Sequence, residues 1–549
     1  MIPGLVIAVY LAIILYVGLF AFRRGKSTGE DFFLASRTLG PWVFLLALFG
    51  TNMTAFAILG SSGLAYQRGI GVYGLMASAS GFMIPLTLFF IGTRLWALGK
   101  RHGYMTQVQF FRERWECSAI GTVIFVLTAA MLVPYIIIGV MGGGHTLEAL
   151  TTVLGPDSKP VMREVIRGGQ TVLETQHWVS YEAGGAVVAL VVMTYVFFGG
   201  MRGTAWVNAL QTSMFLIFGT LAFILISKNL GGLDHIMESL AAKPATASLL
   251  NRQRIPMEEF FSYTFIPLSS IMFPHVAIMC LTAQKVTSFK NTVIFYPLCI
   301  MAIWLPSVLL GVIGAHQFPG LLPGQSDEVL LRLLTANTDV WLAGALGAAI
   351  MACVMATDSQ ILALGTMFTQ DIFAHYGGRE RFGERVQVWT GRVFVIAITV
   401  VAYLIALRLK DKAGIFELAI RFAFSGFAAL APVMLAALFW RRSTKWGALA
   451  AVLWVLAAML GTWYLHEISA GIAPKPGQPR VPIFPDLGNL LLRSPGNVLV
   501  HGFLPVVPMC LGSALLMLVG SLLTRPPSPA TIKKFFSVER SDQPRQKRG

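Results

Sequence analysis

A short polar cluster interrupts an apolar stretch near the start of the chain. Residues 41–66 contain no charged side chain, and Gly50-Thr51-Asn52-Met53-Thr54 lie in the middle of this stretch. About 20 apolar residues cross a bilayer as a helix, and carbonyls that leave a helix there must bond to protein, water or an ion. Two interpretations of the cluster stay open: an unwound segment that binds an ion or solute, or a face of small residues that packs against another helix.

A second apolar stretch, residues 258–283, shows the same kind of interruption. Its uncharged part carries Pro267, Pro274 and neighbouring polar residues, and interior prolines remove backbone hydrogen bonds. The two interruptions lie in the second and the seventh apolar run, five runs apart, so residues 41–227 and 258–440 form two five-run units of opposite orientation. This pattern is typical of transporters built as an inverted repeat, with the site between the two broken helices.

The composition places the whole chain in a membrane. Its 549 residues are 55% hydrophobic and 12% charged, with a mean hydropathy of +0.69, which predicts an all-α polytopic membrane protein. We expect 13 transmembrane helices, near residues 2–22, 41–66, 70–95, 118–144, 181–200, 204–227, 258–283, 291–316, 339–370, 389–407, 414–440, 447–466 and 498–523. The first run lacks a preceding basic segment, so we interpret it as a retained helix.

The distribution of positive charge predicts the orientation. Segments after odd-numbered runs hold 26 Lys and Arg, and segments on the other side hold 15. Positive residues concentrate on the cytoplasmic side, so we expect the N-terminus outside and the C-terminus inside the plasma (inner) membrane. The net charge of +16 therefore belongs to the membrane surface, and no nucleic-acid partner is needed to explain it.

The predicted organisation follows from these spans. The five cysteines show no metal or disulfide spacing and are interpreted as small apolar residues. We expect a leading helix with an entry segment (1–40), a first five-helix repeat (41–230), a second inverted repeat (258–440), two trailing helices (441–523) and a disordered basic cytoplasmic tail (524–549).

Several short motifs, in order along residues 1–465, resemble the sodium:solute symporter family, which includes proline, pantothenate, sialic acid and sodium-glucose transporters. They are Asp31-Phe32-Phe33-Leu34-Ala35-Ser36-Arg37, Gly199-Gly200 with Ala205-Trp206-Val207-Asn208-Ala209-Leu210-Gln211, Asp358-Ser359 with Thr369-Gln370-Asp371-Ile372, and Ser425-Gly426 with Pro432-Val433, Phe439-Trp440-Arg441-Arg442 and Gly447-Ala448. The resemblance implies a LeuT-like fold of one leading helix, ten core helices in a 5+5 inverted repeat, and two trailing helices.

The resemblance also implies an ion site. Family members hold sodium with backbone oxygens of the first broken helix and with carbonyl and hydroxyl oxygens of the eighth core helix. The corresponding residues here are Gly50, Met53, Ala352, Ala356 and Thr357. Na⁺ is the expected coupling ion and no resident cofactor is expected.

The sequence departs from the family at ion-linked positions. Met355 and Ala356 stand where the family carries a hydroxyl pair, and Asn52 and Asn208 stand where it carries aspartates. A hard cation prefers oxygen ligands with anionic support. Proton coupling, uncoupled transport and a sensor that has lost sodium coupling therefore stay open beside sodium symport.

Asp358 is a third coupling candidate beside Asn52 and Asn208. A carboxylate inside a membrane span is costly and functional by default, while the alternative is a solvated residue in the cytoplasmic half of a long helix. Its role would be to bind the coupling ion or a proton.

Arg421 is the candidate for recognising the solute. It lies four residues after Glu417, so a simple ion pair along one helix face is one interpretation. The other is that its guanidinium binds a carboxylate, since the next residue, Phe422, contacts solute by the family resemblance. A small carboxylate or zwitterion is the favoured solute.

The remaining candidates line the expected cavity or carry no role. His275, which follows Pro274, is either a packed histidine or a solute ligand. The other expected lining residues are Thr54, Phe56, Tyr73, Ser78, Tyr135, Ser269 and Ser270. His145 and Glu148 are expected near the outer mouth without an assigned role.

The function classes follow from these observations. We expect a secondary active transporter whose partners are a small-molecule solute and the lipid bilayer; the sequence does not determine the oligomeric state. An enzyme is disfavoured, because nine His and 26 acidic residues form no HExxH motif or clustered metal spacing.

Overall fold

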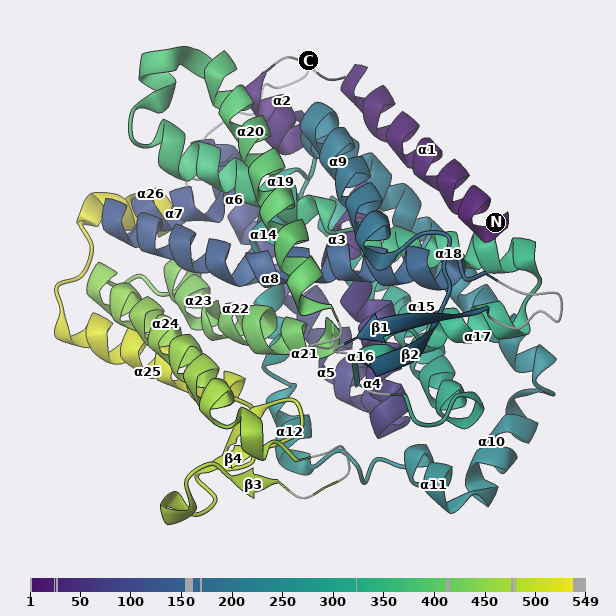
Figure 1. Ribbon diagram of the computed structural model, residues 1–549. Helices are drawn as coiled ribbons and strands as arrows, with labels where there is room; N and C mark the ends of the chain where they lie inside the picture. The colour runs from purple at the N-terminus through teal and green to yellow at the C-terminus, as the bar shows by residue number, and fades with distance from the viewer. Residues whose placement is uncertain are drawn as a thin grey trace, which may run out of the picture.

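The fold consists of long helices that run side by side, with short elements gathered at the two ends of the bundle (Figure 1). The computed structural model describes residues 2–23, 25, 28–153, 161–167, 170–321, 323–410, 415–474, 478 and 480–536. The predicted all-α membrane class is confirmed at this level, apart from two small sheets in the connecting segments.

Ten helical segments among the described residues are long and apolar enough to cross a membrane, or up to twelve if each of two bent pairs is counted as one span. The ten are α1 (Ile2–Arg23), α5–α6 (Gly71–His102), α8 (Ser118–Leu150), α9 (Tyr181–Asn229), α15 (Ser288–Gln317), α18–α19 (Val340–Ala374), α20 (Gly378–Leu409), α22–α23 (Ala419–Phe439), α24 (Lys445–Ile468) and α25 (Val506–Leu523).

The expected spans 181–200 and 204–227 both fall within α9, a single 49-residue element. The element departs from helical geometry at Gly200, where φ is 51° and ψ is −147°. Such a conformation suits glycine, which has no Cβ.

The two bent pairs are the two interruptions predicted from the sequence. The first joins α3 (Pro41–Asn52) to Phe56–Arg68, which ends in α4 (Ser61–Arg68), at 59°, and the second joins Met257–Met272 to α14 (Pro274–Leu281) at 49°. The backbone leaves the helix at Met53 (φ −109°, ψ 95°). It leaves the second helix at Phe273 (ψ 123°), because a residue before proline disfavours the helical region. Both predicted breaks are confirmed.

Helix α8 lies at the centre of the fold and packs against α9, α18 and α20. Small residues bring these helices close: an added Cβ at Gly139 would overlap Thr357, and one at Gly142 would lie 2.9 Å from Ala55. Small interfacial residues are the usual way for membrane helices to approach each other. The helix thereby contacts both the first break and the α18–α19 junction.

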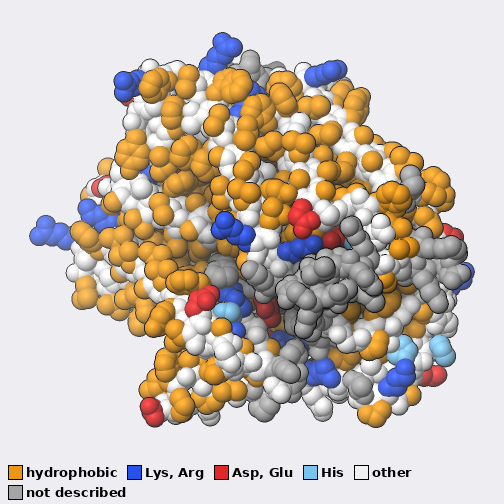
Figure 2. Space-filling model, in the orientation of Figure 1, with side chains coloured by type: hydrophobic (Ala, Val, Ile, Leu, Met, Phe, Trp, Pro, Cys, Tyr) orange, Lys and Arg blue, Asp and Glu red, His pale blue; other side chains and the backbone are white. Residues whose placement is uncertain are grey.

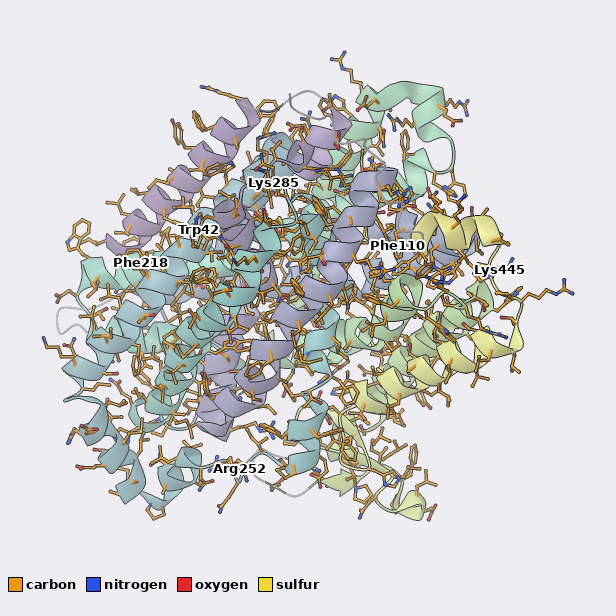
Figure 3. All side chains as sticks on the ribbon, turned by 180° about the vertical axis from the view of Figure 1, so that it is seen from behind. Trp42, Phe110, Phe218, Arg252, Lys285 and Lys445 are labelled. Atoms are coloured by element: carbon orange, nitrogen blue, oxygen red, sulfur yellow. The ribbon has the colours of Figure 1, made fainter. Side chains whose placement is uncertain are left out.

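The other helices surround this centre. Helix α1 packs along α9 and α18, α15 packs against α3, α4 and α5, and α24 pairs with α25 beside α22 (Ser425–Ala429). Hydrophobic side chains cover most of the face in view, and Lys and Arg lie mainly toward its edges (Figure 2). Seen from behind, Lys285 and Lys445 lie toward one end of the bundle and Arg252 lies at the other (Figure 3).

The described chain ends lie at opposite ends of α8. Gly4 in α1 approaches Thr151, directly after α8, and Thr531 near the end of the chain bonds to Glu116, directly before α8. We call the end of the bundle near Thr151 the loop end and the end near Glu116 the tail end. The loop end gathers β1 (Met162–Arg167), β2 (Gln170–Thr175), α10 (Leu233–Ala242), α11 (Pro244–Ala247), α12 (Met257–Ser262), α16 (Pro323–Ser326), α17 (Val329–Asn337), β3 (Val481–Pro482), β4 (Leu491–Arg493) and β5 (Val498–Val500) (Figure 1).

The strands form two antiparallel sheets at that end. β1 pairs with β2, with Met162 opposite Thr175, and β4 lies between β3 and β5. Three further short helices complete the core: α13 (Ser269–Met272), α21 (Ile415–Leu418) and α23 (Ala431–Phe439).

The tail end holds α2 (Gly29–Leu34), α7 (Gln107–Arg114) and α26 (Pro529–Phe536). Helix α26 differs from the expectation of a disordered tail over 524–549. Its Lys534 Nζ bonds to Glu113 Oε2 at 2.5 Å, and the Phe536 ring stacks on the guanidinium of Arg114. Amphipathic spacing within Thr531–Phe536 produces this docking face, a pattern too short to stand out in a basic, proline-rich segment. Residues 537–549 lie outside the described part.

Candidate functional site

The first break is held by side chains from three other helices. The Tyr135 hydroxyl donates to the carbonyl of Asn52 (3.3 Å), and the Gln360 amide donates to that of Thr51 (3.1 Å). The Cys353 thiol donates to the carbonyls of Met53 (3.4 Å) and Thr54 (3.1 Å). Carbonyls released by the break therefore all have partners from α8, α18 or α19, as burial requires.

The expected sodium ligands meet at this break only in part. Ala352 and Ala356 are fully buried on the α18–α19 junction that faces it. The Gly50 carbonyl, however, accepts the Met53 N–H (3.1 Å). The Thr357 hydroxyl donates within its own turn to the carbonyl of Val354 (3.1 Å) and packs on α8. Its contacts here are therefore to α8 and its own helix.

Cys353 is a site residue that the sequence did not reveal. It was interpreted as a small apolar residue, and its thiol instead bonds two carbonyls of the broken segment. A sulfur atom is a soft ligand and does not suit a hard cation such as sodium. The signal available in the sequence was its spacing, one helical turn before Ala356.

A polar node lies directly beside the break. The Asn208 amide donates to the hydroxyls of Thr51 (3.1 Å) and Ser359 (2.7 Å), and these two hydroxyls also bond to each other. The Ser359 hydroxyl donates to Asp358 Oδ1 (3.1 Å), and the Tyr195 hydroxyl donates to Asp358 Oδ2 (3.0 Å). Two coupling candidates, Asn208 and Asp358, are thus brought together through Ser359.

Asp358 is completely buried in this node. It is the first residue of α19, where the helix N-terminus favours a negative charge. Among the described residues, no Lys or Arg forms a salt bridge with it. The Asn208 side-chain oxygen is also buried and has no hydrogen-bond partner. The node therefore offers a carboxylate, two hydroxyls and an open amide oxygen within one buried cluster.

The third coupling candidate, Asn52, points elsewhere. Its amide donates to the hydroxyl of Tyr296 on α15 (2.7 Å), and its side-chain oxygen is buried without a partner. Asn52 lines a cavity between the two broken helices instead of joining the node.

That cavity leaves about 30 Å³ open to water-sized molecules, room for about two waters. The lining residues are Asn52, Met53, Phe56, Met76, Ser80, Ile84, Tyr263, Ile266, Pro267, Ser269, Ser270, Trp304, Ile420 and Phe424. Phe56, Ser269 and Ser270 were expected there. None of these lining side chains is charged, and the Trp304 indole N–H is buried without a partner.

An aromatic wall closes one side of this cavity. Phe424 contacts Phe56 (ring centroids 4.8 Å apart) and Phe273 (5.3 Å), and Tyr135 stacks on Phe273 (5.4 Å). His275 lies behind Phe273 (4.9 Å), fully surrounded, and neither ring nitrogen has a hydrogen-bond partner. Tyr135 and His275 therefore support the wall from behind.

Three further expected lining residues, beside Tyr135 and His275, lie outside the cavity. Ser78 is exposed, and its hydroxyl donates to the carbonyl of Gly74 in its own helix (2.5 Å). Tyr73 is only partly buried, and Thr54 is buried but does not line the cavity. Ser80 takes the position expected of Ser78, because it lies on the buried face of α5.

Arg421, the residue expected to bind a solute carboxylate, is not among the side chains that line the cavity. Its guanidinium donates to the carbonyl of Gly496 (2.5 Å), lies 3.4 Å from the His466 ring and 3.9 Å from the Glu417 carboxylate. The π-helical turn Ala419–Phe424 adds a residue to the turn and directs Arg421 toward α24. The Phe422 side chain lies outside the described part, and Phe424 faces the cavity.

Comparisons with known proteins identify the family of this chain. The family model of the sodium:solute symporter family matches residues 32–154 and 161–454. The chain belongs to the sodium:solute symporter family. The resemblance predicted from the motifs is thereby confirmed.

Relatives in this family match over most of their length. The sodium/proline symporter of Salmonella typhimurium is 25% identical over 495 residues, covering 84% of this chain and 89% of the relative. The sodium/pantothenate symporter of Escherichia coli is 24% identical over 522 residues, covering 93% and 94%.

Solved structures share the fold. A Na⁺-coupled sialic acid symporter in a substrate-bound outward-open state superposes with a TM-score of 0.70 at 15% identity, covering 96% of this chain and 99% of that one. Mhp1, a nucleobase-cation-symport-1 family transporter in a closed conformation, superposes with a TM-score of 0.53 at 12% identity, covering 91% and 97%.

Proposed function

We propose that the protein is a sodium-coupled symporter of a small organic solute that works by alternating access. One observation carries the proposal: two broken helices face a shared cavity, and an oxygen-rich node lies directly behind the first break. Broken helices near the midplane are the usual place for substrate and coupling ion in secondary transporters. The sodium-coupled relatives in the same family support this function.

The node beside the first break is the proposed cation site. Asp358 supplies the negative charge, Thr51 and Ser359 supply hydroxyl oxygens, and Asn208 supplies its open amide oxygen. Oxygen ligands with one carboxylate suit a hard monovalent cation. Asp358 thus supplies the negative charge that the neutral Asn208, which stands in place of a family aspartate, does not.

The family-derived set forms a second proposed ion position. Its ligands would be the carbonyl oxygens of Gly50, Met53, Ala352 and Ala356 with the Thr357 hydroxyl, after the Gly50 carbonyl and the Thr357 hydroxyl exchange their present partners, the Met53 N–H and the Val354 carbonyl. An ion at this position would share the Met53 carbonyl with the Cys353 thiol, which donates to that oxygen here.

The solute position is the cavity between the broken helices. The Asn52 side-chain oxygen and the Trp304 N–H are buried there without partners. A zwitterion fits both, because its ammonium can donate to Asn52 and its carboxylate can accept from Trp304. The small free volume means that Phe424 and its neighbours must move to admit a solute, since ligand pockets usually measure hundreds of Å³.

We further propose the 13-span topology with a 5+5 inverted repeat over 41–230 and 258–440. Helix α9, with 49 residues, is ~73 Å long at 1.5 Å per residue, about twice the thickness that one span needs. Counting it as two spans that meet at Gly200, together with the two broken pairs, supports thirteen.

The proposed location is the plasma (inner) membrane, with the N-terminus outside and the tail end inside. The basic residues of α6, α7 and α26 at the tail end support this orientation. The loop end then faces outward.

Uptake into proteoliposomes tests the function. Purified protein is reconstituted, and labelled amino acids are offered under a sodium gradient, a proton gradient and no gradient. Sodium symport predicts accumulation that requires inward sodium and collapses with a sodium ionophore. Accumulation that ignores sodium contradicts the proposal.

A proton-coupled transporter is the second candidate, and Asp358 favours it. The carboxylate is buried and bonded to the hydroxyls of Tyr195 and Ser359 rather than to a cationic side chain, an arrangement that also suits proton exchange. Accumulation under a proton gradient without sodium would support this candidate. Equilibration without accumulation indicates an uncoupled transporter, and solute binding without uptake indicates a sensor.

A further inference from the structure

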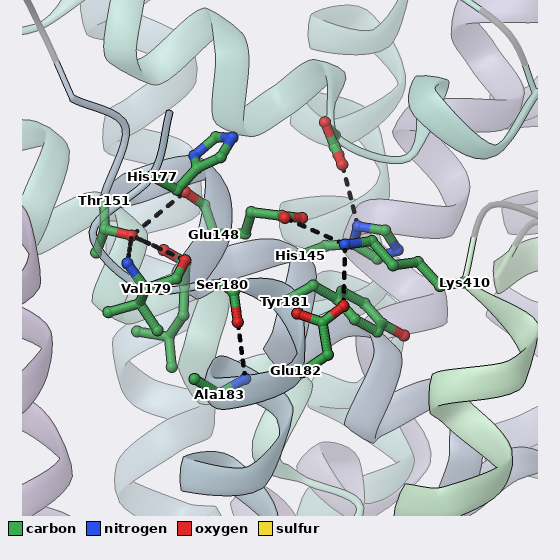
Figure 4. A network of polar contacts seen from close by, with 12 residues as sticks. His145, Glu148, Thr151, His177, Val179, Ser180, Tyr181, Glu182, Ala183 and Lys410 are labelled. Atoms are coloured by element: carbon green, nitrogen blue, oxygen red, sulfur yellow. Dashed lines mark hydrogen bonds and ion pairs between the residues drawn. The ribbon is translucent and has the colours of Figure 1, made fainter. Parts of the chain in front are cut away.

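A cluster of metal-ligating side chains lies at the loop end, far from the central site. His145 and Glu148 occupy one face of α8 (Figure 4), and Glu328 directly precedes α17. One ligand atom from each residue lies within 4.8 Å of the other two. The three residues come from segments about 180 positions apart, so the cluster joins α8 to the α16–α17 segment.

Each ligand is positioned by the fold. The His145 Nδ1 atom lies 3.0 Å from Glu328 Oε1, and the ring packs 4.8 Å from that of Tyr181. His145 is 5% exposed, while the Glu148 and Glu328 side chains are each 18% exposed. The histidine is therefore fixed by packing, and the carboxylates remain in contact with solvent through which an ion can enter.

A cation already lies against this cluster. Lys410 Nζ bonds to Glu148 Oε1 (3.2 Å), lies 3.6 Å from Glu182 and stacks over the Tyr181 ring (4.6 Å; Figure 4). The Glu328 carboxylate is paired with Arg332 (3.0 Å). Both carboxylates of the cluster therefore attract positive charge, and Lys410 and Arg332 compete with any ion for Glu148 and Glu328.

We propose that His145, Glu148 and Glu328 bind a divalent transition metal ion, preferably Zn²⁺, in place of the Lys410 ammonium. One imidazole nitrogen and two carboxylates form a ligand set that suits zinc, with water in the fourth position. Ca²⁺ and Mg²⁺ prefer oxygen ligands alone. Zinc ligands lie roughly 3.4 Å apart in a tetrahedron, so a rotation of the Glu148 side chain closes the site.

A bound metal would link α8 to the segment that contains Glu328, on the outer side of the transporter. The segment that contains Glu328 also contacts the outer half of the first broken helix, where Gln67 donates to the Ser326 hydroxyl (2.8 Å). Asp327 accepts the backbone N–H of Ile415 at the start of α21 (2.8 Å). A metal that joins this segment to α8 holds both contacts in place, so external Zn²⁺ inhibits uptake. This consequence for transport rests on the proposed orientation and function.

Metal binding is measured directly, so that the test does not depend on transport. Full-length protein in nanodiscs is titrated with Zn²⁺ against a chelating dye, and with Co²⁺ while its visible absorption is recorded. We expect one site per chain. His145→Gln and Glu328→Gln each weaken Zn²⁺ binding at least ~10-fold, and His145→Gln also changes the Co²⁺ spectrum.

Two further variants sharpen the test. Lys410→Met removes the competing ammonium, so it tightens Zn²⁺ binding. This increase in affinity tests the site independently of whether the variants of the ligand residues fold. His235→Gln, at an exposed position in α10, is the matched control and leaves binding unchanged. Equal affinity in wild type, His145→Gln and Lys410→Met overturns the proposal. Absence of Zn²⁺ binding in wild-type protein that shows sodium-driven uptake overturns the metal site and leaves the transport function standing.

Discussion

The Cys353 sulfur lies 3.1 Å from the carbonyl oxygen of Thr54, at the point where the first transmembrane helix pair is broken. The thiol joins α18 to the unwound segment through a weak hydrogen bond. It holds two backbone oxygens that an incoming cation would otherwise find open.

Replacing this thiol by a hydroxyl should strengthen sodium binding. Cys353→Ser offers a hard oxygen beside the Met53 and Thr54 carbonyls. A gain of about 1 kcal/mol lowers the sodium concentration for half-maximal uptake about fivefold. The measurement is sodium-dependent uptake in proteoliposomes. Cys299→Ser, at a partly buried position of α15, is the control, and an unchanged sodium dependence in Cys353→Ser contradicts the second ion position.

Neutralising Asp358 should abolish the stabilisation of the folded protein by bound Na⁺. A bound ion stabilises the native protein by about 2.7 kcal/mol at 100 times its Kd, so saturating Na⁺ raises the Tm of the wild type by a few degrees. Asp358→Asn should abolish this shift and cation-driven uptake, because it removes the single carboxylate of the node. Thermal unfolding with Na⁺ or choline checks the shift. A shift of equal size in Asp358→Asn excludes the node as the cation site.

Trp304 should determine solute affinity. Its indole N–H is buried in the cavity without a partner, so Trp304→Phe retains the apolar surface and loses one donor. A hydrogen bond to a charged carboxylate contributes about 1.5–3 kcal/mol, which corresponds to an increase in KM of at least about tenfold. Trp341→Phe, at an exposed position of α18, provides the comparison. Equal KM values in the two variants would show that the solute does not use Trp304.

Arg421 should matter for stability rather than for solute binding. Arg421→Ala removes the bond to the Gly496 carbonyl and costs about 1.5–3 kcal/mol, while KM stays within about twofold of the wild type. Unfolding curves and uptake kinetics on one preparation separate the two effects. Arg408→Ala, at an exposed position of α20, is the control. A large rise in KM with an unchanged Tm would restore the carboxylate hypothesis.

The stability of the loop end should fall as the pH rises. Burial raises the pKa of Asp327 to about 7, the Ile415 N–H and His145 oppose the shift, and Glu417 and Glu328 add to it. An acid whose folded pKa exceeds its unfolded value of ~3.9 stabilises the fold in its protonated form. That stability is present below the unfolded pKa and is lost as the pH rises to about 7.

Asp327→Asn should therefore be less sensitive to pH than the wild type, and more stable at pH 8. The amide oxygen can still accept the Ile415 N–H. Tm values from pH 5 to pH 8 check this expectation, with the exposed Asp339→Asn as control. Parallel curves for wild type and Asp327→Asn would show that this carboxyl does not control the pH dependence.

The sequence located the broken helices because backbone chemistry causes them. Gly50 with its polar neighbours, and Pro274 after Phe273, disfavour helix locally, so the breaks could be placed without knowledge of tertiary contacts. Asn208 and Asp358 were recognised as candidates through family motifs. Their connection through Ser359 depends on how α9 and α19 pack, which no local pattern records.

Arg421 and Cys353 show where local reasoning fails. A π-helical turn changes which side chain faces inward, and it left no signal in the sequence, so the contacts of Arg421 with Gly496 and His466 could not be predicted. Cys353 was overlooked because a thiol among alanines and methionines has the pattern of packing. The direction in which each of these two side chains points changes when its helix rotates by a fraction of a turn.

Helix α26 packs an aromatic ring over positively charged side chains at the tail end. Phe536 stacks on Arg94, Arg114 and Arg441, which come from three separate segments. In the proposed orientation, a chain shortened before α26 would remove this ring from the three guanidinium groups beside the membrane leaflet in which anionic lipids concentrate. Each exposed positive residue near such a surface attracts it by about 1 kcal/mol, so in that orientation the tail end of a truncated protein would bind lipid headgroups that the intact tail keeps at a distance.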